Sequence, residues 1–182
     1  MLWRSTYICV IDNYTFNTAG MNKLKIKKLM IFAYDHRGII MTDRGPCGTN
    51  VSAAYCRDWM QNCAKKFTKT RPDLLGDGPL ILHDNARLHL GRVVTDFLSK
   101  YKWKVLPHAP YSPDMSPPDF DLFRKLKEPM RGHRFPSLEE VSSTVTHAIR
   151  GLNKSGTLDE ITNLPKRWDA VNEKQGDYIE GM

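Results

Sequence analysis

The chain has 182 residues, and 41% of them are hydrophobic, which suits one globular domain with a buried core and argues against intrinsic disorder. Its formal net charge of +7 at neutral pH favours a polyanionic partner, although a basic soluble surface without such a partner is the alternative. No apolar run approaches the roughly 18 residues needed to span a bilayer, and no signal-peptide pattern is present, so we expect no membrane association and an intracellular location.

Strands are predicted near the N-terminus. Residues 5–11 are β-branched and aromatic and lead to Asp12, so a strand would carry a carboxylate at its C-terminal tip. That carboxylate is a candidate metal ligand, and an ordinary Asp-Asn turn is the alternative that these residues alone favour. The next predicted elements are a basic run at 23–28, a strand over 29–34, a turn at 35–38 and a strand over 39–42.

Helices are predicted through the rest of the chain. Thr49 or Asn50 caps a predicted helix over 51–67, in which Cys56 and Cys63 share a face. None of the four cysteines has neighbours at zinc-site spacing, so we interpret them as reduced thiols. The remaining predicted elements are a linker over 71–79, a buried strand over 80–82, a helix over 86–101, a strand over 103–106, a helix from Asp119, a helix over 138–153 capped by Ser137, and two short turns separated by Pro165.

Two further aspartates occupy positions suited to metal chemistry. Asp84 follows an apolar run, so it is expected where a short buried strand ends, and Asp119 opens a helix after two prolines. Thirty-four residues separate them. A carboxylate at the third position of a helix also acts as a cap, and that role of Asp119 would need no metal. Asp114 and Asp121 are interpreted as a loop residue and a residue on another helix face.

The strings HDNARLH and VLPHAPYSPDMSPPDFDLF, together with this spacing, resemble the catalytic domain of mariner-type transposases. The resemblance runs from about Ile11 to the C-terminus. It implies an α/β, RNase H-like domain, with a mixed sheet flanked by helices, that uses two Mg²⁺ or Mn²⁺ ions to cut and join DNA. It makes Asp12, Asp84 and Asp119 the catalytic metal ligands.

Several other residues are expected around these acids. Asn85 and His89 would orient the ligands or a phosphate, although a lone His at a helix start is more often a cap. The lysines before the second strand either contact phosphates or form a solvated strand edge. The residues expected to contact DNA are Lys23, Lys25, Lys27, Lys28, Arg87 and His108.

The chain also departs from the family pattern. Only residues 13–22 separate Asp12 from Lys23, so the long loop that clamps a partner subunit in the family is largely missing, which weakens the expectation of a homodimer. Residues 1–182 are expected to form a single nuclear domain, a truncated or domesticated copy without the family's N-terminal helix-turn-helix domains. The alternatives are a catalytically impaired module that binds DNA or protein, and a decayed remnant.

Overall fold

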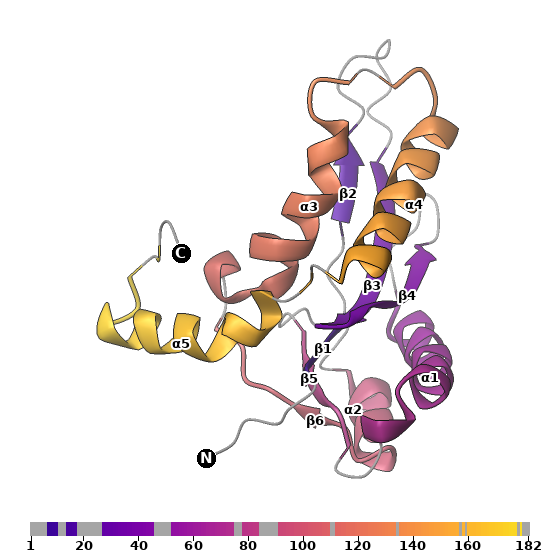
Figure 1. Cartoon of the computed structure of the whole chain (residues 1–182). Helices are drawn as coiled ribbons and strands as arrows, with labels where there is room; N and C mark the ends of the chain where they lie inside the picture. The colour runs from indigo at the N-terminus through magenta and orange to yellow at the C-terminus, as the bar shows by residue number, and fades with distance from the viewer. Residues whose placement is uncertain are drawn as a thin grey trace.

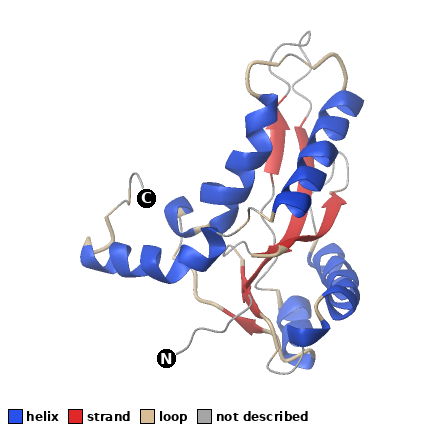
Figure 2. Ribbon diagram, in the orientation of Figure 1, coloured by secondary structure: helices blue, strands red, loops and turns tan. Residues whose placement is uncertain are grey.

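The computed structural model describes most of the chain and shows a mixed sheet with helices on both faces (Figures 1 and 2). The described residues are 7–10, 14–17, 27–45, 52–74, 78–83, 91–109, 112–133, 135–156, 158, 160–177 and 179. The strands are β1 (Tyr7–Val10), β2 (Tyr14–Asn17), β3 (Lys27–Asp35), β4 (Gly38–Arg44), β5 (Leu80–Leu82) and β6 (Lys104–Val105). The α-helices are α1 (Ala53–Thr70), α2 (Arg92–Lys100), α3 (Phe123–Lys127), α4 (Leu138–Ser155) and α5 (Leu164–Glu173).

The long strand β3 organises the sheet. Its antiparallel partner β4 pairs along one edge, while β1 and β2 pair with successive stretches of the other edge. On the far side of β1 the sheet becomes parallel, with β5 beside β1 and β6 beside β5. Cys9 of β1 pairs with Leu82, the last residue of β5. The carboxyl ends of β1 and β5 therefore lie side by side at one edge of the sheet.

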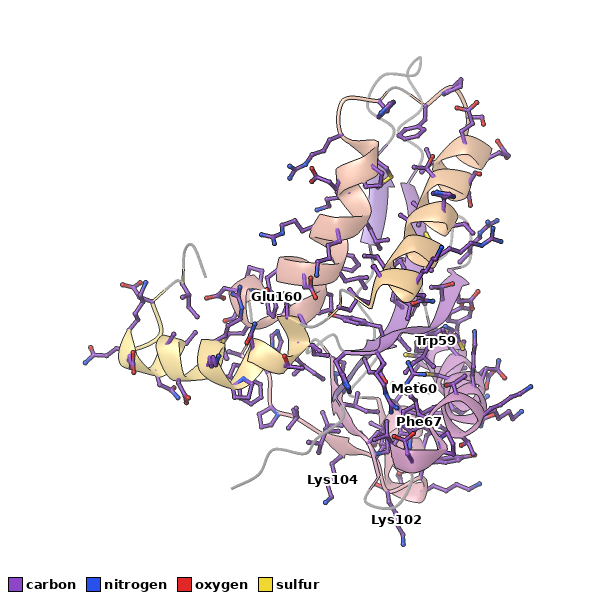
Figure 3. The ribbon with its side chains drawn as sticks, viewed as in Figure 1. Trp59, Met60, Phe67, Lys102, Lys104 and Glu160 are labelled. Atoms are coloured by element: carbon purple, nitrogen blue, oxygen red, sulfur yellow. The ribbon has the colours of Figure 1, made fainter. Side chains whose placement is uncertain are left out.

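Side chains of β3 alternate between two cores, as the two-residue period of a strand requires. Ile31 and Ala33 pack into a core with α1 and α2, to which Trp59, Met60 and Phe67 contribute (Figure 3). Phe32 and the other β3 side chains that point to its side of the sheet pack with α3, α4 and Leu164 of α5. The sheet is thus the middle of three layers.

The two described cysteine side chains belong to the first of these cores. Cys56 and Cys63 are buried thiols on the inner face of α1, and neither forms a disulfide. Burial raises the pKa of the Cys63 thiol to about 12, so it remains protonated at neutral pH. This agrees with their interpretation as reduced core thiols.

The structure corrects several details of the predicted elements. Ser52, and not Thr49 or Asn50, caps α1, because its hydroxyl accepts a hydrogen bond from Tyr55 N at 3.1 Å. Pro165 lies in the first turn of α5 and does not separate two turns, since proline suits a helix start. Ser137 does cap α4, accepting from Glu140 N at 3.2 Å as predicted. Strand β2 was not anticipated.

Candidate active site

The segment that carries Asp119 is a helix start built from prolines and one wide turn. Asp119 N donates to Ser116 O at 2.9 Å, and Pro118–Leu122 then forms a single π-helical turn that continues into α3. Such turns are rare and often occur at functional sites. Here the turn leaves Asp119 exposed while Asp121, which ion-pairs with Lys125, is fully buried. The two acids therefore lie on different faces of the turn, as the sequence predicted.

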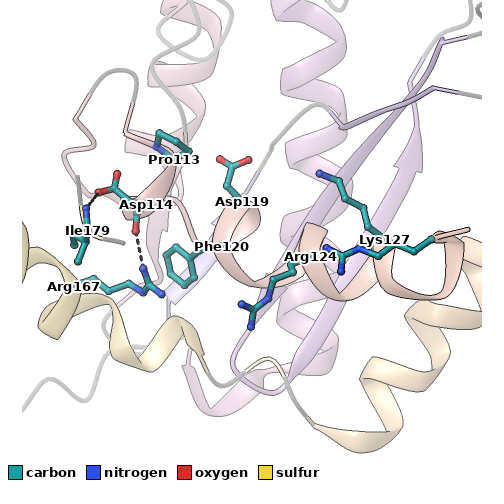
Figure 4. A pocket seen from close by; sticks show the side chains of 9 residues that line it. Pro113, Asp114, Asp119, Phe120, Arg124, Lys127, Arg167 and Ile179 are labelled. Carbon is teal, nitrogen blue, oxygen red and sulfur yellow. Dashed lines mark hydrogen bonds between the residues drawn. The ribbon is translucent and has the colours of Figure 1, made fainter. Parts of the chain in front are cut away.

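Asp119 faces an open cavity of about 370 Å³ (Figure 4). Among the residues that the structure describes, none forms a hydrogen bond or ion pair with its carboxylate, so the capping role is not what holds it. Most of the charged residues that share the cavity with Asp119 are basic. The lining residues are Pro113, Asp114, Asp119, Phe120, Arg124, Lys127, Arg131, Arg167 and Ile179.

The C-terminal part of the chain braces the turn before Asp119. Arg167 of α5 is buried, donates from Nη1 to Asp114 O at 3.2 Å, and places its guanidinium carbon 3.9 Å from the centre of the Phe120 ring. Ile179 N donates to the Asp114 carboxylate at 3.2 Å. Residues on both sides of the Pro117 helix start are thus held from α5 and the segment after it, which limits how far Asp119 can move.

The same segment is anchored to the sheet beside the ends of β1 and β5. Leu122 and Phe123 share a core with Leu82, and the Phe123 ring lies edge-to-face with Phe32 at 5.9 Å. In the sequence, Asp12 follows the last residue of β1 by two positions, and Asp84 follows the last residue of β5 by two. Both aspartates lie outside the described residues.

Known proteins are similar to the chain in sequence or in fold, although no protein-family model matches it. The Mariner Mos1 transposase of Drosophila mauritiana is 30% identical over 166 residues, which cover 90% of this chain and 48% of that protein. The histone-lysine N-methyltransferase SETMAR of Homo sapiens is 30% identical over 103 residues, or 57% of this chain and 15% of that protein. The chain thus spans about half the length of the Mos1 protein that it matches.

The solved catalytic domain of Mos1 has the same fold as this chain. It superposes with a TM-score of 0.83 and 28% identity, over 96% of this chain and 84% of that structure. The chain resembles the catalytic domain of the mariner-type transposases in both sequence and fold. Its fold is RNase H-like, as the resemblance in the sequence implied. Solved structures of the Mos1 protein include its catalytic domain with Mn and a paired-end complex with a left transposon end.

Only part of the expected mariner-type site lies within the described residues. Asp119 and His108 are described, with His108 partly buried. Lys27 and Lys28 are placed as backbone of β3, paired with β2. The expected residues that lie outside are Asp12, Lys23, Lys25, Asp84, Asn85, Arg87 and His89. Within the described ranges, no group of three or more His, Cys, Asp or Glu side chains is arranged to hold a metal ion.

Sequence reasoning about this mariner-type site missed the basic residues around Asp119. Arg124, Lys127 and Arg131 line the cavity from the helix that follows Asp119, and Arg167 reaches it from α5. Arg124 and Lys127 could have been found from the sequence, because they follow the candidate ligand Asp119 and lie three positions apart, which puts them on one helix face. No sequence signal connects Arg167 to Asp114, which is 53 residues away. No helix in the described ranges is long and apolar enough to cross a membrane.

Proposed function

We propose that this chain is a transposase-derived, metal-dependent DNA endonuclease and strand-transfer domain that acts in the nucleus. Asp12, Asp84 and Asp119 are its metal-binding catalytic residues. The observation that carries the proposal is the exposed Asp119 carboxylate, which has no described partner and lies on a braced turn anchored beside the end of β5. The solved Mos1 complexes with transposon ends and with Mn or Mg support the same substrate and cofactor.

The donor set fits a hard divalent cation. Mg²⁺ and Mn²⁺ prefer carboxylate oxygen, and the three proposed ligands are all aspartates. Two such ions, when bound, lower the pKa of the attacking water and neutralise the leaving oxygen. The contribution of the chain itself is to position the three aspartates. Adjacent parallel strands lead to Asp12 and Asp84, while Arg167 and Ile179 restrain the turn before Asp119.

A second candidate function is DNA binding without cleavage. It is favoured by the cations around the cavity, which attract phosphates whether or not the acids bind metal. The short interval between β2 and β3, residues 18–26, also leaves little chain for the loop that clamps a partner subunit in the family. A homodimer of the family type is therefore not part of our proposal.

Plasmid nicking tests the enzymatic proposal. Supercoiled plasmid is incubated with Mn²⁺ or Mg²⁺ and three proteins: the parent, Asp119→Asn, and the matched control Asp169→Asn, which alters an exposed aspartate of α5. We expect the Asp119 variant to nick at least about 100-fold more slowly, as when one charge-stabilising group is lost from other active sites. The control should nick like the parent.

Two results would count against the enzyme. Equal nicking rates of the Asp119 variant and the parent would show that Asp119 is not a catalytic residue. No nicking by the parent, with salt-sensitive retention of DNA, would favour the binding module instead. Conversion of Asp12 and Asp84 to Asn in separate variants extends the same assay to the residues that lie outside the described ranges.

A further inference from the structure

We infer that Arg124, Lys127 and Arg131 form a continuous binding track for the phosphates of one DNA strand, leading away from Asp119 along α3. We call these three residues the α3 track. The inference deepens the proposed function, since it takes from it the identity of the polyanion as DNA. It adds the path of the strand across this chain and the residues that set it.

Position along one helix is the first support for the α3 track. Arg124 and Lys127 lie three residues apart in α3 and therefore share a face. Arg131 follows Glu128–Met130, the short 3₁₀ turn η4 that extends the same helix. All three side chains line the cavity that contains Asp119, and all three residues are exposed (Figure 4 labels the first two).

Charge is the second support. Arg131 is 3.4 Å from Glu128, but both side chains are 68% exposed, and such surface pairs exchange readily for a phosphate. No ion pair of Arg124 with another described residue is present. Lys125, by contrast, points to the buried Asp121 at 2.5 Å and is only 24% exposed. The segment thus uses Lys125 inside the fold and presents Arg124 and Arg131 to the cavity.

Spacing indicates a polymer and not a single small anion. The seven steps from Arg124 to Arg131 span roughly 10 to 12 Å, at about 1.5 Å of rise per residue in α3 and about 2.0 Å in the 3₁₀ turn. One strand of duplex DNA carries a phosphate about every 3.4 Å along the helix axis, so this length holds about three phosphates. Three cations therefore face about three phosphates. A folded acidic protein surface has no such regular spacing.

The two acids that share the cavity influence the side on which the strand lies. Asp114 and Asp119 also line the cavity, and like charge repels a phosphate from them. Asp114 is also held in place by Ile179, so it does not rotate away. A strand on the α3 track would run beside Asp119 with its phosphates on the basic side. This is how the site would orient a scissile strand before any chemistry.

Binding of a labelled DNA duplex in EDTA, followed by anisotropy over a series of salt concentrations, tests the α3 track without metal or cleavage. The test variant carries Arg124→Gln, Lys127→Gln and Arg131→Gln. The control carries Lys65→Gln, Lys66→Gln and Lys69→Gln, which remove the same charge from exposed positions of α1. Melting temperatures of both variants, compared with the parent, verify that they fold.

Each neutralised phosphate contributes about 0.7 to 0.9 to the slope of log K against log salt concentration, so loss of the track should reduce the slope by about 2 to 3. The α1 control should change it by less than about 1. An unchanged slope in the track variant, or equal losses in both variants, would overturn the inference. So would displacement of the DNA by polyglutamate at the same charge concentration, which would indicate an acidic protein partner.

The two proposals fail in different ways. If the parent does not nick DNA but the track variant has a smaller slope of log K against log salt concentration, the α3 track is supported and the enzymatic proposal is not. If Asp119→Asn abolishes nicking while the track variant keeps the parent slope, the enzyme stands and the strand takes another path. Because binding is measured in EDTA, neither result depends on the other.

Discussion

At the scale of single residues, the buried ion pair between Asp35 and Arg71 depends most on its partners, because the Asp35 carboxylate is shielded from water. Arg71 donates to it from Nε at 2.7 Å and from Nη2 at 3.0 Å, and Arg37 N donates at 2.9 Å. Its side chain is fully buried, whereas that of Arg71 is 16% exposed. The hydrogen bond to Asp35 raises the pKa of the Arg71 guanidinium. The pair fixes the start of the β3–β4 turn to the end of α1.

Removal of the Asp35 charge should destabilise the fold strongly. We expect Asp35→Asn to lower the free energy of unfolding by about 2 to 4 kcal/mol, because the Arg71 charge then lacks its partner in a largely buried position. Urea unfolding measures the change. The same substitution at Asp73, which pairs with Arg37 at the surface, is the control and should leave the midpoint unaltered. Equal effects of both substitutions would contradict the role given to burial.

Residue roles were predictable from sequence only where they depend on close neighbours. The cap at Ser137 was predicted from its capping box, and the structure confirms it. The buried side chains of Leu122, Phe123 and Leu126 likewise follow the local spacing of one helix face. Asp35 was expected to be a turn residue, because Asp-His-Arg-Gly is turn chemistry. Its partner Arg71 is 36 residues away. Contacts at that separation depend on how the elements pack, which local patterns do not encode.

At the scale of elements, the β3–β4 turn joins helices from both faces of the sheet. Arg71 attaches α1 to it, and Asn153 of α4 attaches on the other side. The Asn153 amide accepts from Ile39 N at 2.6 Å and donates to Ile39 O at 3.3 Å, so it pairs with β4 as a neighbouring strand would. Gly38 makes this approach possible, since a Cβ there would lie 2.7 Å from Asn153 Oδ1.

A double-mutant cycle tests this connection between α4 and β4. Gly38→Ala should cost about 1 to 3 kcal/mol, from the positive φ of +129° and from the clash with Asn153. Asn153→Ala should cost about 1 kcal/mol through the two lost hydrogen bonds. In the double variant the clash is gone, so its cost should fall short of the sum by at least about 0.5 kcal/mol. Strict additivity in chemical denaturation would show that the two residues do not meet.

Elements with strong patterns were predicted, and those that rely on pairing were not. The β3–β4 hairpin, α4 and β5 follow from apolar runs, turn residues and a capping box. Strand β2 was missed because Tyr14–Asn17 was treated as the remnant of a shortened loop, although its alternation of aromatic and polar residues is typical of a strand. In α2, Val93 is 40% exposed while the adjacent Val94 is buried, because neighbouring helix positions point in different directions.

At the scale of the whole molecule, the fold class came from the resemblance and not from periodicity. Alternating patterns predict strands and helices but not their order in a sheet, and the antiparallel and parallel halves that meet at β1 are a property of long-range pairing. Sequence motifs such as SPPDFDLF do indicate the strand order, because they are typical of a family whose fold is known. The same motifs predict Asp119 as a ligand, and its role in metal binding is still a prediction.

Metal binding can be tested on the whole molecule without any assay of activity. A ligand that binds only the folded chain stabilises it by about 2.7 kcal/mol at a hundredfold excess over its Kd, which for a chain of this length raises the melting temperature by about 5 to 10 °C. We expect Mn²⁺ to produce such a rise and EDTA to reverse it. Asp119→Asn should lose most of the rise while keeping the melting temperature of the parent in EDTA, because Asp119 is exposed and makes no hydrogen bond or ion pair with another described residue. Asp169→Asn should respond to Mn²⁺ like the parent. If the melting temperature of the parent is the same in Mn²⁺ and in EDTA, the protein has no metal site where the ends of β1 and β5 meet the segment before α3. The match in fold would not change that conclusion.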